Sequence, residues 1–338
     1  MSTIYAAYGE TLLVVDGAGD AADAGGSPTL QEHRFDSRTQ SVAVTDGTVL
    51  LGTFEDGLQR STDGGDSWER ATGIEHDAVT AIAAAPDDPA TVYAGTEPSR
   101  FYRSTDGGAT FERLDGLTDL PSSDDWAFPP RPHTHHVRWI EPDPADPDLL
   151  HVSIEAGAQV RARLTDDGVD WEDRVPGTRR DVHTMATHPA TPGRVWVAAG
   201  DGYAETADGG DSWEHPQSGL NHTYCWSVAV DPAGGVEPST PRVLLSAASG
   251  ANDAHRRGES YLYRREGDAW ERLDGRGVPT GEGVYRAVLA RGADEGTFWA
   301  ANNHGLYRTD DGGDTWERRV SLADRVDAPT CRGLVVVD

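Results

Sequence analysis

Short runs of apolar residues, each closed by a polar turn, follow one another along the chain. The clearest unit reads VTAIAAAP, DDPA, TVYAGT, FYRS and TFERL between residues 79 and 114. Its first run is apolar almost throughout, which is typical of a strand covered on both faces, and its proline and aspartate residues end that run as a turn. The unit therefore predicts four consecutive strands, A to D.

One polar phrase recurs between the predicted strands C and D. Its six copies are STDGGDSWER from Ser61, STDGGATFER from Ser104, LTDDGVDWED from Leu164, TADGGDSWEH from Thr206, REGDAWERL from Arg265 and TDDGGDTWERR from Thr309. The aromatic residue of the phrase recurs at spacings of 43, 60, 42, 57 and 46 residues, so the unit is about 43 residues long and two units carry insertions. Four-stranded propeller blades repeat at about 40 to 50 residues.

The repeat predicts an all-β fold, a seven-bladed β-propeller with four-stranded antiparallel blades. The C-terminal PTCRGLVVVD has the pattern of a strand A without partners, and the N-terminal TIYAAYG, TLLVVDG and QEHRF have the pattern of strands B to D without a strand A. Pairing them closes the ring and removes two exposed sheet edges. Six or eight blades are the alternatives. We expect residues 1–338 to form a single domain with blades at about 38–72, 76–114, 133–175, 180–216, 222–273, 282–319, and 326–338 plus 1–37.

Charge narrows the range of partners. The 338 residues include 57 acidic and 29 basic ones, every basic one is arginine, and the formal net charge is −28. Such a surface suits a halophilic cytoplasm, where salt screens the repulsion. It argues against nucleic-acid binding and against docking to anionic membranes. The N-terminus has no secretory pattern, which favours a cytoplasmic protein, and Cys225 and Cys331 are expected to be free thiols.

The repeated phrase matches the Asp-box, S/T-x-D-x-G-x-T/S-W, and the chain resembles the BNR/Asp-box repeat β-propellers. That family, which is sialidase-like and related to the YVTN/BNR-like propellers, includes tandem-repeat xyloglucanases, sortilin-type receptors and photosystem assembly factors; the charge suggests a halophilic archaeal type. The resemblance implies that the boxes are structural and lie on the face opposite the active site. The box aspartates are Asp63, Asp106, Asp166, Asp208 and Asp311. Calcium binding by the boxes is the alternative.

Ligand contacts are therefore expected at the other face, where two insertions fall, Asp115 to His136 and Ser249 to Ser260. One position near the start of strand A differs in chemistry from blade to blade. Its occupants are Gln40, Thr80, Arg138, His183, Trp226, Arg286 and Arg332. Arginines gathered in an acidic protein suggest an anion site; ion pairs with channel carboxylates are the alternative. The ligand-binding candidates are Arg138, His183, Trp226, Arg286, Arg332, His136 and His304.

Catalytic and metal-binding candidates lie around the same face. Glu155, Asp201, His183, Tyr224 and Tyr285 could supply the carboxylates, the acid/base group or the tyrosine nucleophile of a glycosidase. A divalent metal is a further alternative, with His135, His136, His183 and His222 as candidate ligands; otherwise no cofactor is expected.

Two functions remain open. A binding or scaffold role at the channel mouth is favoured, toward a small anionic molecule, a glycan or a protein partner. The alternative is a sialidase-like glycoside hydrolase or lyase at the same mouth, with Arg138, Arg286 and Arg332 as the arginine triad that the resemblance implies. The N-terminal R-I-P motif of sialidases is missing, and seven blades differ from the six of sialidases. A monomer is expected.

Overall fold

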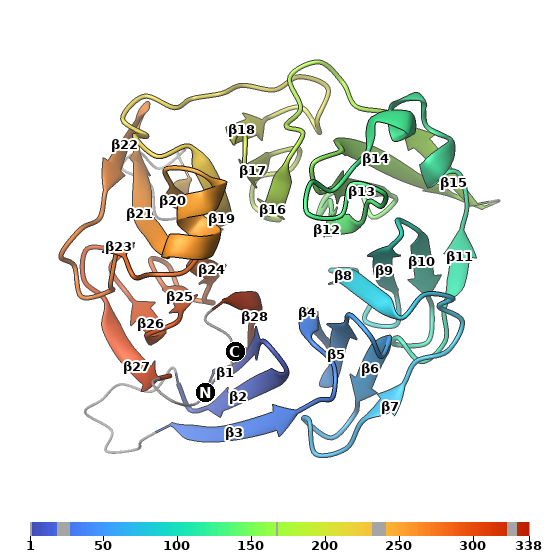
Figure 1. The fold of residues 1–338 in the computed structure, drawn as a ribbon, viewed down its shortest axis with the longest axis horizontal. Helices are drawn as coiled ribbons and strands as arrows, with labels where there is room; N and C mark the ends of the chain where they lie inside the picture. The colour runs from blue at the N-terminus through green and yellow to red at the C-terminus, as the bar shows by residue number, and fades with distance from the viewer. Residues whose placement is uncertain (1, 19–27, 167, 232–240, 323–329, 338) are drawn as a thin grey trace. The chain divides into compact units, whose positions relative to one another are not determined.

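The computed structural model describes residues 2–18, 28–166, 168–231, 241–322 and 330–337. Its strands form seven antiparallel sheets, and the chain is a seven-bladed β-propeller, as predicted (Figure 1). The chain divides into two compact units, residues 40–215 with four sheets, and residues 1–39 together with 216–338 with three sheets. In the described residues no helix is both long enough and apolar enough to cross a bilayer.

The 40–215 unit holds four consecutive blades. Their strands are β4 (Thr39–Thr45), β5 (Thr48–Thr53), β6 (Leu58–Ser61) and β7 (Glu69–Arg70); β8 (Ala78–Ala84), β9 (Val92–Glu97), β10 (Phe101–Ser104) and β11 (Glu112–Leu114); β12 (Val137–Pro142), β13 (Leu149–Ile154), β14 (Ala158–Thr165) and β15 (Gly168–Glu172); and β16 (Val182–Ala186), β17 (Val195–Ala199) and β18 (Gly202–Thr206). The second strands β9, β13 and β17 are buried along their whole length, and most of their residues are apolar. The first strand β8, which the sequence predicted to be covered on both faces, keeps Ile82 and Ala84 half-buried.

The blade of β16 to β18 is one strand short. Its outer position is reduced to a single pair, in which Glu205 and Glu214 exchange two backbone hydrogen bonds of 3.0 and 2.8 Å. Pro216 follows two residues later and has no N–H to donate, so the ladder cannot extend. The repeat predicted a fourth strand here, and this proline is the reason that it is missing.

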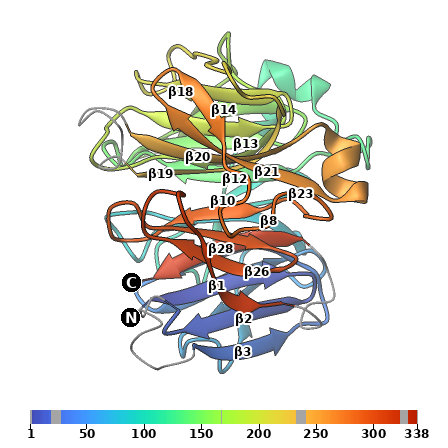
Figure 2. The ribbon, with the colours of Figure 1, turned by 90° about the vertical axis from the view of Figure 1, so that its left-hand side faces the viewer.

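The other unit holds three blades, and one of them joins the two ends of the chain. Its strands are β28 (Cys331–Val337), β1 (Thr3–Tyr8), β2 (Thr11–Asp16) and β3 (Thr29–Arg34); β19 (Tyr224–Asp231), β20 (Arg242–Ala248), β21 (Glu259–Glu266) and β22 (Ala269–Arg272), with β23 (Gly281–Glu282) paired to β21; and β24 (Val288–Arg291), β25 (Phe298–Asn302), β26 (Gly305–Thr309) and β27 (Glu317–Ser321). Strand β28 lies antiparallel beside β1 (Figures 1 and 2). The predicted closure by the N- and C-terminal strands is confirmed.

The box turns follow the third strands of their blades and are held by their own aspartates. In the turn after β10, Asp106 Oδ1 accepts hydrogen bonds from Ser104 Oγ (2.7 Å) and from the N–H of Thr110 (2.9 Å), while Oδ2 accepts one from Thr110 Oγ1 (2.7 Å). Although burial opposes it, these bonds lower the pKa of the Asp106 carboxyl to about 2. Asp63, Asp208 and Asp311 make the same set of bonds.

The third and fifth copies of the phrase differ. After β14, Thr165 already pairs with Gly168, and after β21, Glu266 pairs with Ala269. Asp166 therefore lies in a shorter hairpin connection than the other four box aspartates.

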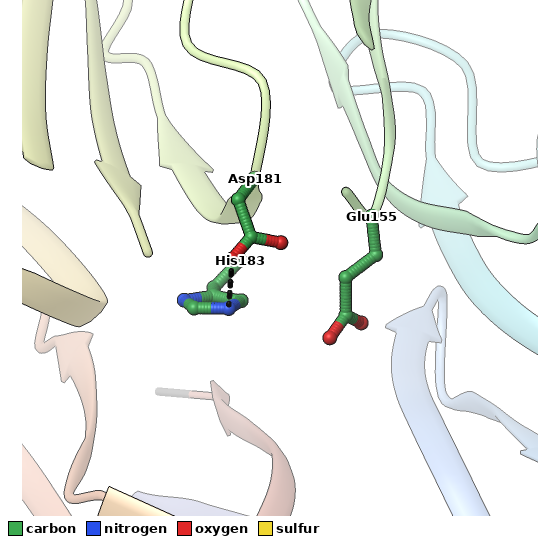
Figure 3. A group of neighbouring side chains, drawn as sticks. All are labelled: Glu155, Asp181 and His183. Atoms are coloured by element: carbon green, nitrogen blue, oxygen red, sulfur yellow. Dashed lines mark ion pairs between the residues drawn. The ribbon is translucent and has the colours of Figure 1, made fainter. Parts of the chain in front are cut away.

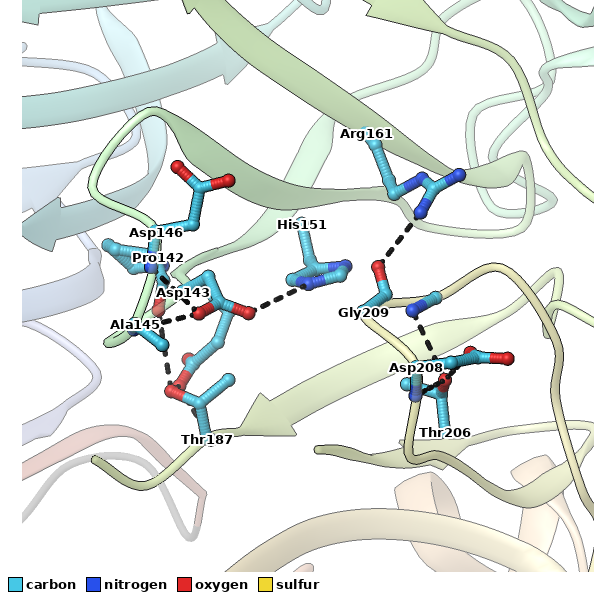
Figure 4. A network of polar contacts seen from close by, with 12 residues as sticks. Pro142, Asp143, Ala145, Asp146, His151, Arg161, Thr187, Thr206, Asp208 and Gly209 are labelled. Atoms are coloured by element: carbon cyan, nitrogen blue, oxygen red, sulfur yellow. Dashed lines mark hydrogen bonds and ion pairs between the residues drawn. The ribbon is translucent and has the colours of Figure 1, made fainter. Parts of the chain in front are cut away.

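Arginines tie box turns to the blade before them. Arg161 on β14 donates to the carbonyl of Gly209 (2.9 Å) and also pairs with Glu172 on β15 (2.7 Å). Figure 4 shows Arg161 reaching the turn that Thr206 and Asp208 form. Arg60 and Arg264 bind the carbonyls of Gly107 and Gly312 in the same way. Each of these arginines fastens one blade to the next inside its unit.

Glycines form a second joint between blades. Five linkers place a glycine with positive φ against the box aromatic residue of the following blade, within each unit. The pairs are Gly73 with Phe111, Gly116 with Trp171, Gly177 with Trp213, Gly219 with Trp270, and Gly277 with Trp316. A Cβ atom at Gly73, Gly219 or Gly277 would lie closer than 3 Å to the backbone of its aromatic neighbour. Only glycine fits there.

Candidate functional site

A β-bulge recurs near the start of the first strand of several blades. The ladder skips Thr80 in β8, Arg138 in β12, His183 in β16, Trp226 in β19 and Arg332 in β28. These are five of the seven positions that the sequence singled out as one variable site per blade. A bulged residue is left out of the ladder and its side chain is re-aimed. The chemical variety at this position therefore comes from residues that the sheet itself does not need.

In the 40–215 unit, the bulged Arg138 and the neighbouring His136 contact Glu155, which directly follows β13. Arg138 Nε lies 3.3 Å from Glu155 Oε2, and His136 Nε2 lies 2.9 Å from the same oxygen. All three side chains are buried, at 6, 5 and 8% exposure for Arg138, His136 and Glu155. Burial would raise the pKa of the Glu155 carboxyl, but His136, Arg138 and His183 together lower it well below its usual range. Glu155 is held ionised by its neighbours.

A second carboxylate extends this group. Glu97, the last residue of β9, receives two hydrogen bonds from Arg131, at 2.7 and 2.5 Å, and lies 3.6 Å from His136 Nδ1. The Arg131 guanidinium also stacks over Phe54 at 5.1 Å and over Phe128 at 4.8 Å. Arg131 and His136 both come from the first insertion, so this insertion contributes to the group.

A third carboxylate, Asp181, stands beside Glu155 and His183. Figure 3 shows the three side chains gathered from neighbouring strand ends, and one donor atom from each lies within 4.8 Å of the others. His183 is fully buried, with Nε2 3.9 Å from Asp181 Oδ2. Burial raises the pKa of the half-buried Asp181 carboxyl, and Glu155 and Asp201 add to that rise while His183 opposes it. The two adjacent carboxyl groups thus have pKa values shifted in opposite directions, lowered for Glu155 and raised for Asp181.

We call the set Glu97, Arg131, His136, Arg138, Glu155, Asp181 and His183 the polar cluster. Asp201 lies at its edge and does not take part directly. Its carboxylate accepts hydrogen bonds from the backbone N–H groups of Arg180 (3.1 Å) and Asp181 (3.3 Å). Asp201 therefore shapes the turn that carries Asp181. His135 packs against Trp126, and burial and the charges of Arg100 and His136 lower the pKa of its imidazole.

The remaining candidates belong to the other unit. The Tyr224 hydroxyl group and His255 Nε2 share a hydrogen bond of 2.7 Å, and the His255 ring also packs edge-on against Trp226. The Arg286 guanidinium lies 4.6 Å above the Trp226 ring and donates to Thr330 Oγ1 (2.6 Å). His255 comes from the second insertion and was not among the predicted residues.

The last candidates are more dispersed within that unit. His222 stacks on Tyr261 and shares a hydrogen bond with Tyr263. The exposed His304 approaches the carbonyl of Gly283 at 3.3 Å, and Tyr285 is fixed through its N–H to Asn303. Arg332 is half-buried on β28. Arg131 and His255 were missed because each depends on the path of an insertion, which has no repeat to guide its alignment.

The polar cluster offers several kinds of chemistry. It supplies hydrogen-bond donors from Arg131 and Arg138 and acceptors from three carboxylates. Two adjacent carboxyl groups with opposed pKa shifts are the pattern of an acid/base pair. Glu155, Asp181 and His183 also form a set of donors suited to a metal ion.

The chain was compared with known proteins. No protein-family model matches it, and no curated protein matches it. Solved structures with similarity include an ancestral GH74 enzyme, with 16% identity and a TM-score of 0.64 over 83% of this chain. They also include YCF48 bound to D1 peptide (17% identity, TM-score 0.59, 89% of this chain and 92% of that chain). Virginiamycin B lyase from Staphylococcus aureus is a third (14% identity, TM-score 0.58, 87% and 85%).

This chain spans 38% of the length of the ancestral GH74 enzyme. At these identities the similarity shows the fold, which enzymes and a peptide-binding protein share.

Proposed function

We propose that this chain is an Asp-box β-propeller of halophilic, cytoplasmic type that binds a polyhydroxylated ligand, such as a glycan, at the polar cluster. The observation that carries the proposal is the mutual pairing of the cluster. Glu155 is already paired with Arg138 and His136, and Glu97 with Arg131. An anionic ligand would have to displace these carboxylates, whereas hydroxyl groups can accept from the cations and donate to the carboxylates without separating charge.

The surroundings of Arg131 support a sugar-like ligand. Its side chain is 36% exposed, that of Asp181 is 30% exposed, and Phe54 and Phe128 are half-buried beside Arg131. Ligand sites commonly combine aromatic surface with a few fixed polar groups. The exposed edges of Arg131 and Asp181 would then make the first contacts with the ligand.

Calorimetric titration with a panel of neutral and acidic oligosaccharides, in high salt, tests the proposal. Arg131→Ala should weaken binding about ten- to a hundredfold, since a charge-assisted hydrogen bond contributes about 1.5 to 3 kcal/mol. Arg103→Ala is the matched control, because Arg103 forms an exposed pair with Glu112 (2.7 Å) elsewhere in the same unit. Equal losses in both variants, or no binding by any oligosaccharide, would contradict the proposal.

The carboxyl pair supports a second candidate function, glycoside hydrolysis or elimination. Glu155 and Asp181 have donor atoms within 4.8 Å of each other, which is near the about 5 to 5.5 Å of retaining glycosidases. Asp181, whose pKa is raised, would protonate the leaving oxygen, and the ionised Glu155 would act as nucleophile or base. Chromogenic glycosides test this: Glu155→Gln and Asp181→Asn should each abolish turnover that the Arg103→Ala control retains.

A further inference from the structure

We propose that Glu155, Asp181 and His183 bind one divalent transition-metal ion. The three donors come from adjacent ends of two blades in the 40–215 unit: Glu155 follows β13, Asp181 precedes β16 and His183 is the bulged residue of β16. Their donor atoms lie within 4.8 Å of one another, and Figure 3 shows the three side chains close together. The group combines a fully buried imidazole with two carboxylates, so it is more than a patch of surface acid.

Both carboxylates are already oriented by groups behind them. Glu155 Oε2 is held by His136 Nε2 (2.9 Å) and lies 3.3 Å from Arg138 Nε. Asp181 Oδ1 accepts a hydrogen bond from the N–H of Ala156 (3.0 Å). The other oxygens, Glu155 Oε1 and Asp181 Oδ2, take no part in these three contacts. Outer partners that fix a ligand in this way are a regular property of metal sites.

The donor types select the ion. Calcium and magnesium prefer sites made of oxygen ligands, whereas imidazole suits zinc, iron and nickel and carboxylates suit manganese as well. One imidazole and two carboxylates therefore favour Mn²⁺ or Zn²⁺. Two carboxylate charges balance the charge of the ion, and three protein ligands leave coordination positions for water or for a ligand hydroxyl group.

The proposal goes beyond glycan binding and concerns the same cluster, so the two are tested separately. The 338-residue protein is freed of metal with a chelator and titrated with Mn²⁺ and, separately, Zn²⁺ by calorimetry, without any sugar. About 1 M KCl is present because the net charge of −28 attracts cations to the whole surface, and at that salt the Debye length is about 3 Å. The expected result is one tight site per chain. In electron paramagnetic resonance, the sharp spectrum of hydrated Mn²⁺ should disappear when the ion binds to the protein.

Two variants and one control decide the assignment. Asp181→Asn keeps the acceptor for Ala156, and His183→Gln keeps a polar side chain; each should weaken binding about tenfold or more. Asp87→Asn, which changes an exposed turn carboxylate, should leave binding unchanged. If His183→Gln fails to fold, Asp181→Asn alone decides. The proposal is overturned if the wild-type protein binds neither ion at millimolar concentration or if Asp181→Asn binds as tightly as the wild type. Oligosaccharide titration of the metal-free protein measures glycan binding independently of metal binding.

Discussion

The glycine joint between blades makes a sharp prediction at Gly277. This residue has φ +100° and packs against the backbone of Trp316, whose N–H donates to the carbonyl of Arg276 (2.7 Å). In Gly277→Ala the new methyl group would lie closer than 3 Å to the Trp316 backbone. The positive φ costs about 1 to 2 kcal/mol for a residue with a Cβ, and relieving the overlap costs about 1 to 3 kcal/mol more. We expect a total loss of about 2 to 5 kcal/mol in the free energy of unfolding.

Gly275, two residues earlier, provides the control. It also has a positive φ, +71°, but a Cβ there would meet nothing within 4 Å. Gly275→Ala should therefore cost only the backbone strain, about 1 to 2 kcal/mol. Equilibrium unfolding in guanidinium chloride, followed by tryptophan fluorescence, gives both values. If the two variants lose the same stability, contact with Trp316 is not what requires glycine at position 277.

Three further predictions follow from the box turns, the arginine joints and the half-buried carboxyl group of Glu141. Asp106→Ala removes the hydrogen bonds of one box turn and should destabilise the protein by about 1 kcal/mol, as loss of a capping side chain does. Because the pKa of Asp106 is lowered to about 2, this stabilisation is present above about pH 4 and is lost as the pH falls through 2. The stabilities of wild type and variant should therefore converge in acid unfolding titrations. Arg264→Lys keeps a positive charge, but a lysine cannot contact Gly312, Glu271 and Asp314 together as the arginine does. Arg264→Lys should therefore lower the denaturation midpoint more than Arg103→Lys does. Burial raises the pKa of Glu141 to about 7, despite hydrogen bonds from Trp139 and Thr187. A raised carboxyl pKa stabilises the fold below the unfolded value of about 4.5, and this contribution is lost as the pH rises through 7. Between pH 5 and pH 8, Glu141→Gln should therefore gain on the order of 2 kcal/mol in stability relative to wild type, and a constant difference across that range would contradict the raised pKa.

Most of the architecture could be predicted from local patterns. The apolar run of the first strand predicted burial, although the strands that are buried along their whole length are the second ones. The unpaired patterns at the two ends predicted that Cys331 to Val337 would join Thr3 to Tyr8. The missing strand after β18 could not be found by alignment with its neighbours, because the box phrase is complete there and the interruption comes from Pro216. The glycine joints were visible as isolated glycines in the linkers, but the repeat alone did not show what they contact.

The candidate site was only partly predictable. The variable position in strand A was found by alignment, and its physical basis, the bulge, appears only in the ladder register. Sequence could not show that Arg138 would be paired with Glu155, since the two residues lie on different strands and a carboxylate in a turn of an acidic protein has no distinctive signal. The predicted residues Arg138 and His183 lie in one unit and Trp226, Arg286 and Arg332 in the other.

The pairing of β28 with β1 also affects the order in which the protein can be made. Strands β1 to β3 are synthesised before β4 to β28, but the inner partner of β1 is Cys331 to Val337, so that edge stays open until synthesis has reached Val337. An open edge of buried residues such as Ile4, Ala6 and Tyr8 can accept a matching strand from any source. A second copy of the chain presents that strand too, and exchange of β28 between newly made chains is therefore the misassembly to which this blade is most exposed.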